Sequence, residues 1–127
     1  MMNNFETVLT NYYQAWNEGF QTKDATRFRE FMSKSFTGYW AFSGIEKPEV
    51  YDYHYDIVSV LNQYDESTYK EFDVVSSTER KNGENYLVFG TETSMISGQS
   101  HQAKCMYVWG MENGDWKLIR EYTEMGN

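Results

Sequence analysis

The feature that most constrains the fold is a set of turn sequences in the second half of the chain. Asn-Gly stands at residues 82–83 and again at 113–114, and Ser-Gly-Gln stands at 97–99. Asn-Gly supplies the two positive-φ residues of a type I′ turn, which makes it a strong signal for a β-hairpin. The runs between these turns are rich in β-branched and aromatic residues. We therefore predict an antiparallel meander of four strands, over residues 69–80, 85–96, 101–111 and 116–123.

The first half of the chain carries helical spacing instead. Apolar residues recur every three or four positions from Phe5 to Trp16, which predicts a first helix that ends at Gly19. A second, shorter helix is expected to end near Ser33. The aromatic segment 35–42 lacks helical spacing, so it is predicted to be a strand.

A third helix of about four turns is predicted after Pro48, a residue that suits the first turn of a helix. The apolar positions that predict it are Val50, Tyr53, His54, Ile57, Val58, Leu61 and Tyr64. The resulting order is two helices, a strand, a helix and four strands. This order is typical of an α+β domain in which the helices cover one face of the sheet.

Length and charge narrow the class of protein. A chain of 127 residues is long enough for one core and too short for two, so we expect a single domain over residues 1–127. The sequence has 11 Lys and Arg residues and 19 Asp and Glu residues, which gives a net charge of −8 at pH 7. Binding to nucleic acid or to an anionic membrane rests on basic clusters, and the sequence has none. With neither a membrane-spanning stretch nor a signal-peptide pattern, the sequence indicates a cytoplasmic protein.

Cysteine and histidine are too few for a metal site. Cys105 is the single cysteine, so no internal disulfide can form. His54 and His101 are the only histidines, and their spacing to Cys105 is not that of zinc ligands. We expect neither a metal nor another cofactor.

The last hairpin predicts which side chains share a face of the sheet. If residues 113–114 form a two-residue turn, counting back pairs Tyr107 with Arg120 and Cys105 with Tyr122. These four side chains then lie on one face, together with Trp109.

The same counting from the first Asn-Gly turn places Asp73 opposite Glu92 and Val75 opposite Gly90. Two facing carboxylates repel each other unless a cation pairs with them, and Arg120 lies one strand pair away. Gly90 leaves space above the sheet, which the helices can close into a cavity. We therefore predict a pocket on this face.

The opposite face is at least as apolar. Its residues are Phe72, Val74, Leu87, Phe89, Met106, Val108 and Ile119, with Lys104, Lys117 and Glu121 among them. One layer of helices cannot cover both faces, so we predict a homodimer formed through the sheet. Counting groups the residues but does not orient them, and the reverse orientation would place Asp73 and Arg120 in an ion-pair network at the interface.

The overall pattern resembles the nuclear transport factor 2-like superfamily, over nearly the whole chain. Within it, the chain resembles the SnoaL-like group and the association domain of calcium/calmodulin-dependent protein kinase II. The most specific element is Tyr-Val-Trp-Gly-Met-Glu-Asn-Gly-Asp-Trp-Lys-Leu-Ile at 107–119, supported by Tyr-Tyr-Gln-Ala-Trp-Asn-Glu-Gly at 12–19. The resemblance implies a cone-shaped α+β barrel with a curved antiparallel sheet, a pocket between sheet and helices, and dimers formed through the outer side of the sheet.

The resemblance also bears on the pocket. Close relatives have His, on the pocket side, where Arg120 and Tyr122 stand, and the kinase association domain has a pocket Arg where Tyr107 stands. Arg120 would then offer a bidentate partner for a carboxylate ligand. In ketosteroid isomerases of the superfamily, a tyrosine similar to Tyr12 stabilises an oxyanion, but segment 37–41 lacks the carboxylate that acts there as base.

We predict a domain that binds a small organic ligand, with a carboxylate as one candidate, in an aromatic, mostly apolar pocket. A cofactor-free SnoaL-like isomerase, cyclase or dehydratase is an alternative, with Asp73, Glu92, His54 or Tyr12 as candidate catalytic groups. An assembly module that acts through the outer sheet face is another. The predicted pocket residues are Tyr12, Trp16, Tyr39, Trp40, His54, Asp73, Gly90, Glu92, Tyr107, Trp109, Arg120 and Tyr122.

Overall fold

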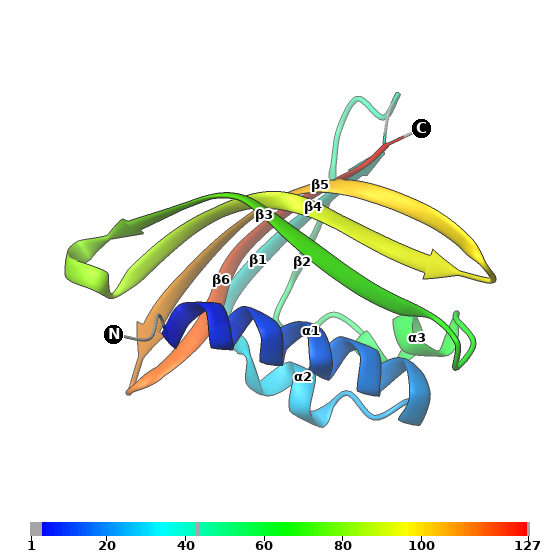
Figure 1. Cartoon of the computed structure of the whole chain (residues 1–127), viewed down its shortest axis with the longest axis horizontal. Coiled ribbons are helices and arrows are strands. Elements are labelled where there is room, and N and C mark those ends of the chain that lie inside the picture. Colours follow the sequence, from blue (N-terminus) through cyan, green and yellow to red (C-terminus); the bar gives the residue numbers. More distant parts are fainter. Residues whose placement is uncertain (1–3, 43, 127) are drawn as a thin grey trace.

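The computed structural model describes residues 4–42 and 44–126, which form helices packed on the concave side of a strongly curved sheet (Figure 1). The helices are α1 (Asn4–Thr22), α2 (Thr26–Glu30) and α3 (Ile57–Asn62). The strands are β1 (Met32–Phe42), β2 (Glu49–Asp52), β3 (Tyr69–Arg80), β4 (Asn85–Ile96), β5 (Gln99–Glu112) and β6 (Asp115–Met125). The predicted α+β class and the placement of the helices on one face are confirmed.

The sheet has the order β2-β1-β6-β5-β4-β3 and is curled without closing. Neighbouring strands are antiparallel except β1 and β6, which are parallel. The expectation of a wholly antiparallel sheet is therefore wrong at this pair. The cause is the path of the chain, because the meander ends by laying β6 beside a strand from the first half of the sequence.

The hairpin signals proved accurate. Strands β3 and β4 have the predicted bounds, while β5 is longer than predicted at both of its turns and β6 begins one residue earlier and ends two residues later than predicted. Ser97-Gly98 and Asn113-Gly114 are two-residue turns whose residues all have positive φ, as a type I′ turn requires. The loop between β3 and β4 is longer, because residues 81–84 separate the paired residues Arg80 and Asn85, and Lys81, Asn82 and Gly83 all have positive φ.

The predicted long third helix is wrong. Residues 49–52 instead form strand β2, which pairs with the edge of β1, and only Ile57–Asn62 is helical. The Asp52 carboxylate accepts a hydrogen bond from the backbone N–H of His54 (2.9 Å), and this turn separates the two elements. Asp56 then caps α3 by accepting from the N–H of Ser59 (3.0 Å).

The first helix runs past its predicted end. Gly19 lies inside α1, where a Cβ would stand 3.2 Å from Cδ1 of Leu61 in α3. The glycine therefore permits close approach of two helices rather than ending one. The second helix stops earlier than expected, at Glu30, because Met32 already begins β1.

A β-bulge in β3 changes the predicted register. From the loop as far as the Ser76–Phe89 pair, β3 and β4 pair as predicted. Val75 is then an extra residue, so that Val74 rather than Val75 pairs with Gly90. A one-residue shift moves every following side chain to the other face of the sheet.

A second bulge, in β6, has the same effect. The predicted pairing holds as far as Trp109 with Leu118, and Ile119 is then extra. Tyr107 therefore pairs with Glu121, and Arg120 lies on the face opposite to the one predicted. A bulge also bends its strand and increases the local twist, so each of these two extra residues changes both the register and the course of the sheet.

The core lies between α1 and the concave face of the sheet. Tyr12 of α1 meets Trp109 of β5 edge to face, with ring centroids 5.1 Å apart, and both side chains are fully buried. Leu118 and Val88 extend the same layer of side chains.

No helix among the described residues is long and apolar enough to cross a membrane.

Candidate functional site

A cavity of about 440 Å³ lies between the helices and the inner face of the sheet. Aromatic rings form much of its wall, and the exposed residues Glu49 and Gln63 border it at the protein surface. The full lining is Trp16, Phe20, Trp40, Glu49, Tyr51, Tyr55, Val60, Gln63, Tyr64, Thr68, Lys70, Glu92, Ser94, Ile96, Glu121, Thr123 and Met125.

Some of the predicted pocket residues line or adjoin this cavity. Trp16, Trp40 and Glu92 are in its wall. Three others, Tyr12, Tyr107 and Trp109, are buried on the same side of the sheet as core residues beside it.

The space predicted above Gly90 does not exist. A Cβ at Gly90 would stand 2.3 Å from Cζ of Phe72, so the Phe72 ring already fills the position over the glycine. The bulge in β3 explains this, because it brings Phe72 opposite Glu92 on the inner face. The cavity is therefore displaced from Gly90 toward α3 and β2.

The remaining predicted pocket residues lie outside the cavity. Asp73 and Arg120 are exposed because the two bulges turn them to the outer face of the sheet. Tyr122 follows Arg120 on β6 by two residues, so it lies on the same outer face. Its hydroxyl donates to Glu124 (2.9 Å). On β1, Tyr39 pairs with Tyr122 and shares its outer face, and His54 is exposed in the turn before α3.

Glu92 is the centre of a buried hydrogen-bond network. Its Oε1 accepts from Nζ of Lys70 (3.2 Å), and its Oε2 lies within hydrogen-bond distance of the hydroxyls of Tyr13 (3.1 Å) and Tyr107 (3.4 Å). Those two hydroxyl oxygens are 2.6 Å apart, so with one proton each, one hydroxyl donates to the other and the second donates to Glu92, or both donate to Glu92. Such partners hold Glu92 in one position and satisfy its charge.

Lys70 completes this network from β3. Burial alone would lower the pKa of Lys70, but the charge of Glu92 and the hydrogen bond to it raise that pKa above its ordinary value. The ammonium group also lies 4.1 Å from the centroid of the Trp16 ring. Lys70 is therefore a cation that is already paired within the protein.

Glu121 is the second carboxyl group on the inner face of the cavity, and it is half-buried. Its side chain accepts a hydrogen bond from the hydroxyl of Tyr51 on β2. Burial raises the pKa of Glu121 to about 7, with a further rise from the negative charge of Glu92, while the bond from Tyr51 and the charge of Lys70 oppose the rise. Glu121 can therefore gain or lose a proton near neutral pH.

Sequence reasoning missed Lys70, Tyr51 and Glu121. Counting without a bulge places Glu121 on the outer face and does not place Lys70 at all. The spacing after Pro48 predicts a helix that includes Tyr51. The chain offers no local signal for the bulges, so only the three-dimensional pairing reveals this side of the site.

Cys105, which does not line the cavity, offers no reactive thiol. Burial raises the pKa of Cys105 to about 12, so the thiol stays protonated at neutral pH. Within residues 4–42 and 44–126, no group of three or more His, Cys, Asp or Glu side chains is arranged to hold a metal ion.

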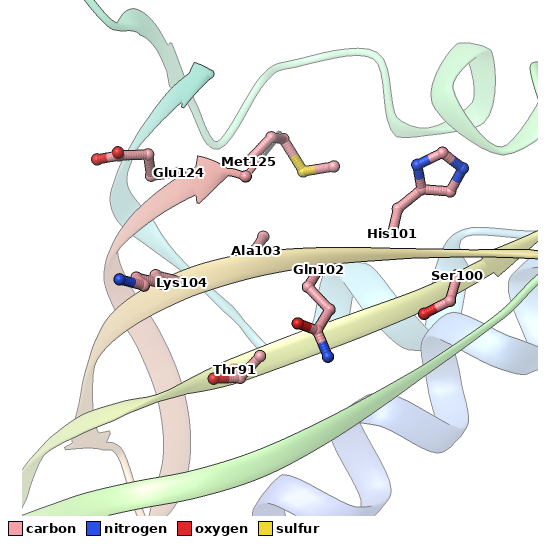
Figure 2. Close-up of a pocket in the computed structure, with 9 residues that line it drawn as sticks. Thr91, Ser100, His101, Gln102, Ala103, Lys104, Glu124 and Met125 are labelled. Carbon is pink, nitrogen blue, oxygen red and sulfur yellow. The ribbon is translucent and has the colours of Figure 1, made fainter. Parts of the chain in front are cut away.

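A second hollow, of about 540 Å³, lies along β5 near the end of β6 (Figure 2). Polar and charged side chains dominate its lining, which has no aromatic ring apart from the imidazole of His101. Figure 2 shows Gln102 and His101 pointing to opposite sides of β5. Because these groups do not converge on one point, the aromatic cavity is the better candidate for a binding site.

Comparisons with known proteins identify the fold. No family model matches the chain, and no curated protein sequence matches it. A nuclear transport factor 2-like protein of unknown function from Silicibacter pomeroyi shares the fold with a TM-score of 0.68 and 9% identity, covering 98% of this chain and 99% of that one. A ketosteroid isomerase-like protein from Erwinia carotovora atroseptica has a TM-score of 0.61 and 13% identity, covering 94% and 92%.

A protein from Nostoc punctiforme, described as having a cystatin-like fold and an unknown function, gives a TM-score of 0.64 at 9% identity, covering 98% of this chain and 93% of that one. The class is therefore an α+β domain whose curved sheet wraps around helices. More particularly, the chain has the nuclear transport factor 2-like fold, which confirms the predicted resemblance. The closer likeness to the SnoaL-like group stays a prediction.

Proposed function

We propose that this protein binds a small organic molecule in the cavity between α1, α3 and the inner face of the sheet. The observation that carries this proposal is the cavity itself, since about 440 Å³ is within the range of small-molecule sites. Its wall also has the composition of such sites, with aromatic rings for an apolar body and a few fixed polar groups such as Glu92 and Lys70.

Acid/base catalysis on the bound molecule is a second candidate function, and Glu121 favours it. A carboxyl group with a pKa of about 7 in a cavity can take a proton from a substrate and return it. Glu121 thus replaces Asp73 and Glu92 as the proposed base, because Asp73 is exposed on the outer face and Glu92 is held by Lys70. A cofactor-free isomerase, cyclase or dehydratase of the SnoaL kind would use such a group.

A thermal-shift screen of neutral, cationic and anionic small molecules tests the site. Ligands that stabilise the protein should bind about tenfold more weakly to Trp40→Ala, which removes about 1.4 kcal/mol of ring contact. Trp116→Ala is the matched control, because Trp116 does not line the cavity. Ligands whose affinity Trp40→Ala leaves unchanged would place the site elsewhere.

Proton NMR of the bound ligands in D₂O would separate catalysis from binding. A catalytic site should exchange a C–H proton of the ligand for deuterium, and Glu121→Gln should abolish that exchange.

The exposed face of the sheet favours the predicted homodimer as a further proposal. The register aligns Phe89, Met106, Tyr122, Tyr39 and Val50 in one row across β4, β5, β6, β1 and β2. Apart from Tyr122, each of them is at least 36% exposed. A row of exposed apolar side chains across a sheet is typical of a protein–protein interface, and a second copy presents the same row.

We expect Met106→Glu to convert a dimer into a monomer, because it places a charge in the middle of that row. Sedimentation equilibrium would measure the change in mass. Val58→Glu on α3 makes the same substitution at an exposed apolar residue away from the sheet and should leave the mass unchanged. A wild-type protein that is monomeric at high micromolar concentration would remove the proposal.

A further inference from the structure

The charges of the cavity wall point to the charge of its ligand. We propose that the ligand is an organic cation, an amine or a quaternary ammonium compound, held by Glu121 against the rings of Tyr51, Tyr55 and Trp40. This inference rests on the proposed function, since it specifies what occupies the cavity.

The first step is the balance of charge. Four residues with charged side chains line the cavity, namely Glu49, Lys70, Glu92 and Glu121. Lys70 and Glu92 neutralise each other at 3.2 Å. The described part of the chain contains one other ion pair, between Arg27 and Glu18, so neither Glu49 nor Glu121 forms an ion pair there, although the charge of Lys70 acts on Glu121 from a greater distance. The charge that the cavity leaves uncompensated is therefore negative.

The second step is the arrangement of the rings. Tyr51 and Tyr55 have centroids 5.0 Å apart and ring planes inclined at 59°, so they form a corner. The hydroxyl of Tyr51 binds Glu121, which places the carboxyl group at this corner. Trp40 of β1 lines the same cavity. Aromatic faces attract cations, and aromatic corners with a nearby carboxylate recognise ammonium groups.

The third step excludes the alternative of an anionic ligand. The carboxylate predicted from the sequence depended on Arg120, which lies exposed on the outer face. The guanidinium of Arg29 donates to the backbone carbonyls of Tyr53 and Tyr55, the latter at 3.0 Å. Lys70 is bound to Glu92 and stacked on Trp16. An anion would thus meet carboxyl groups and no free cation of the cavity wall.

Proton linkage gives the proposal a second, independent signature. The titratable groups that act on Glu121 are Tyr12 of α1, Tyr51 of β2, Tyr55 before α3, Lys70 of β3, Glu92 of β4, and Cys105 and Tyr107 of β5. Among them only Lys70 is cationic, and it is paired with Glu92. A bound cation favours the ionised form of Glu121, so binding releases a proton and the affinity rises with pH. With half-ionisation near pH 7, the ionised fraction and hence the affinity rise about tenfold from pH 6 to pH 8.

Three probes of nearly the same shape test the charge directly: choline, its neutral isostere 3,3-dimethylbutan-1-ol, and the anion 3,3-dimethylbutanoate. Calorimetric or NMR titration of the full chain should show choline binding at least tenfold more tightly than the alcohol at pH 8. Its affinity should fall about tenfold at pH 6. Glu121→Gln should weaken choline binding about tenfold and remove its pH dependence, while Glu124→Gln, on the exposed face of the same strand, should change neither.

Tyr55→Leu provides a variant that leaves the carboxyl group intact. It should weaken the binding of choline and leave that of the alcohol nearly unchanged, because only the cation gains from the ring face. If the alcohol or the anion binds as tightly as choline, and Trp40→Ala weakens it, the cation proposal is overturned and the cavity remains a ligand site. If none of the three binds at millimolar concentration, the cation proposal is also overturned, and the wider screen alone decides the proposed function.

Discussion

Lys70→Met should lower the free energy of unfolding by about 3 kcal/mol, although it changes a single side chain at the edge of the cavity. The reason is Glu92, whose side chain is 8% exposed and would lose its only cationic partner among the described residues. The hydrogen-bonded pair of Tyr13 and Tyr107 hydroxyls would still donate to its Oε2, but the charge would stay uncompensated. Urea denaturation at pH 7, followed by tryptophan fluorescence, measures the loss.

Two further variants separate this cause from a general loss of packing. Lys70→Met with Glu92→Gln should recover most of the stability, because a neutral amide keeps an oxygen for the two tyrosine hydroxyls and needs no cation. Arg27→Met breaks the surface pair with Glu18, where both side chains are more than 40% exposed, and should cost less than about 1 kcal/mol. Equal losses for the buried and the surface pair, with no recovery in the double variant, would contradict the assignment.

The parts of the fold that the sequence predicted are those set by local chemistry. Asn113-Gly114 and Ser97-Gly98 adopt the conformations that their residue types favour, and the strands on either side follow from alternation and turn position. The third helix failed for the opposite reason. Strand β2 exists because it pairs with β1, a contact between separate segments of the chain that helical spacing after Pro48 could not reveal.

The site was predicted only as far as the register held. Glu92 and Tyr107 lie on the inner face as expected, because no bulge separates them along β4 and β5. The same counting predicts Asp73 and Arg120 in the pocket. One extra residue in β3 turns Asp73 to the outer face, and one extra residue in β6 does the same to Arg120. Side chains along a strand alternate between the two faces of the sheet. One extra residue at an undetected bulge therefore turns every predicted side chain beyond it away from the site and brings the adjacent residues in instead.

The stability of the protein should fall as the pH rises from 5 to 8. Glu121 titrates near its ordinary value of 4.5 when unfolded and near 7 when folded, because burial disfavours its charged form. Between these values the folded state binds a proton that the unfolded state has lost, so the free energy of unfolding decreases with pH. The expected loss by pH 8 is about 2 kcal/mol, less than the full shift implies because the side chain is partly exposed.

Glu121→Gln should remove this loss, since an amide accepts the hydrogen bond from Tyr51 and does not ionise. Its stability should match that of the wild type at pH 5 and exceed it by about 2 kcal/mol at pH 8, measured by urea denaturation at each pH. Glu124→Gln, on the exposed face of β6, should leave the pH profile of the wild type unchanged. A wild-type profile that is flat between pH 5 and pH 8 would show that Glu121 titrates in the folded protein as it does in an unfolded chain.

Asp24 and Asp65 act in the opposite sense and in a different pH range. Hydrogen bonds from the side chains of Thr26 and Ser67 hold the pKa of these carboxyl groups below the ordinary value of 3.8. Their contribution is complete above that value and is lost only as the pH falls further. The decline between pH 5 and pH 8 is therefore assigned to Glu121, and a ligand that supplies a positive charge beside Glu121 should reverse that decline.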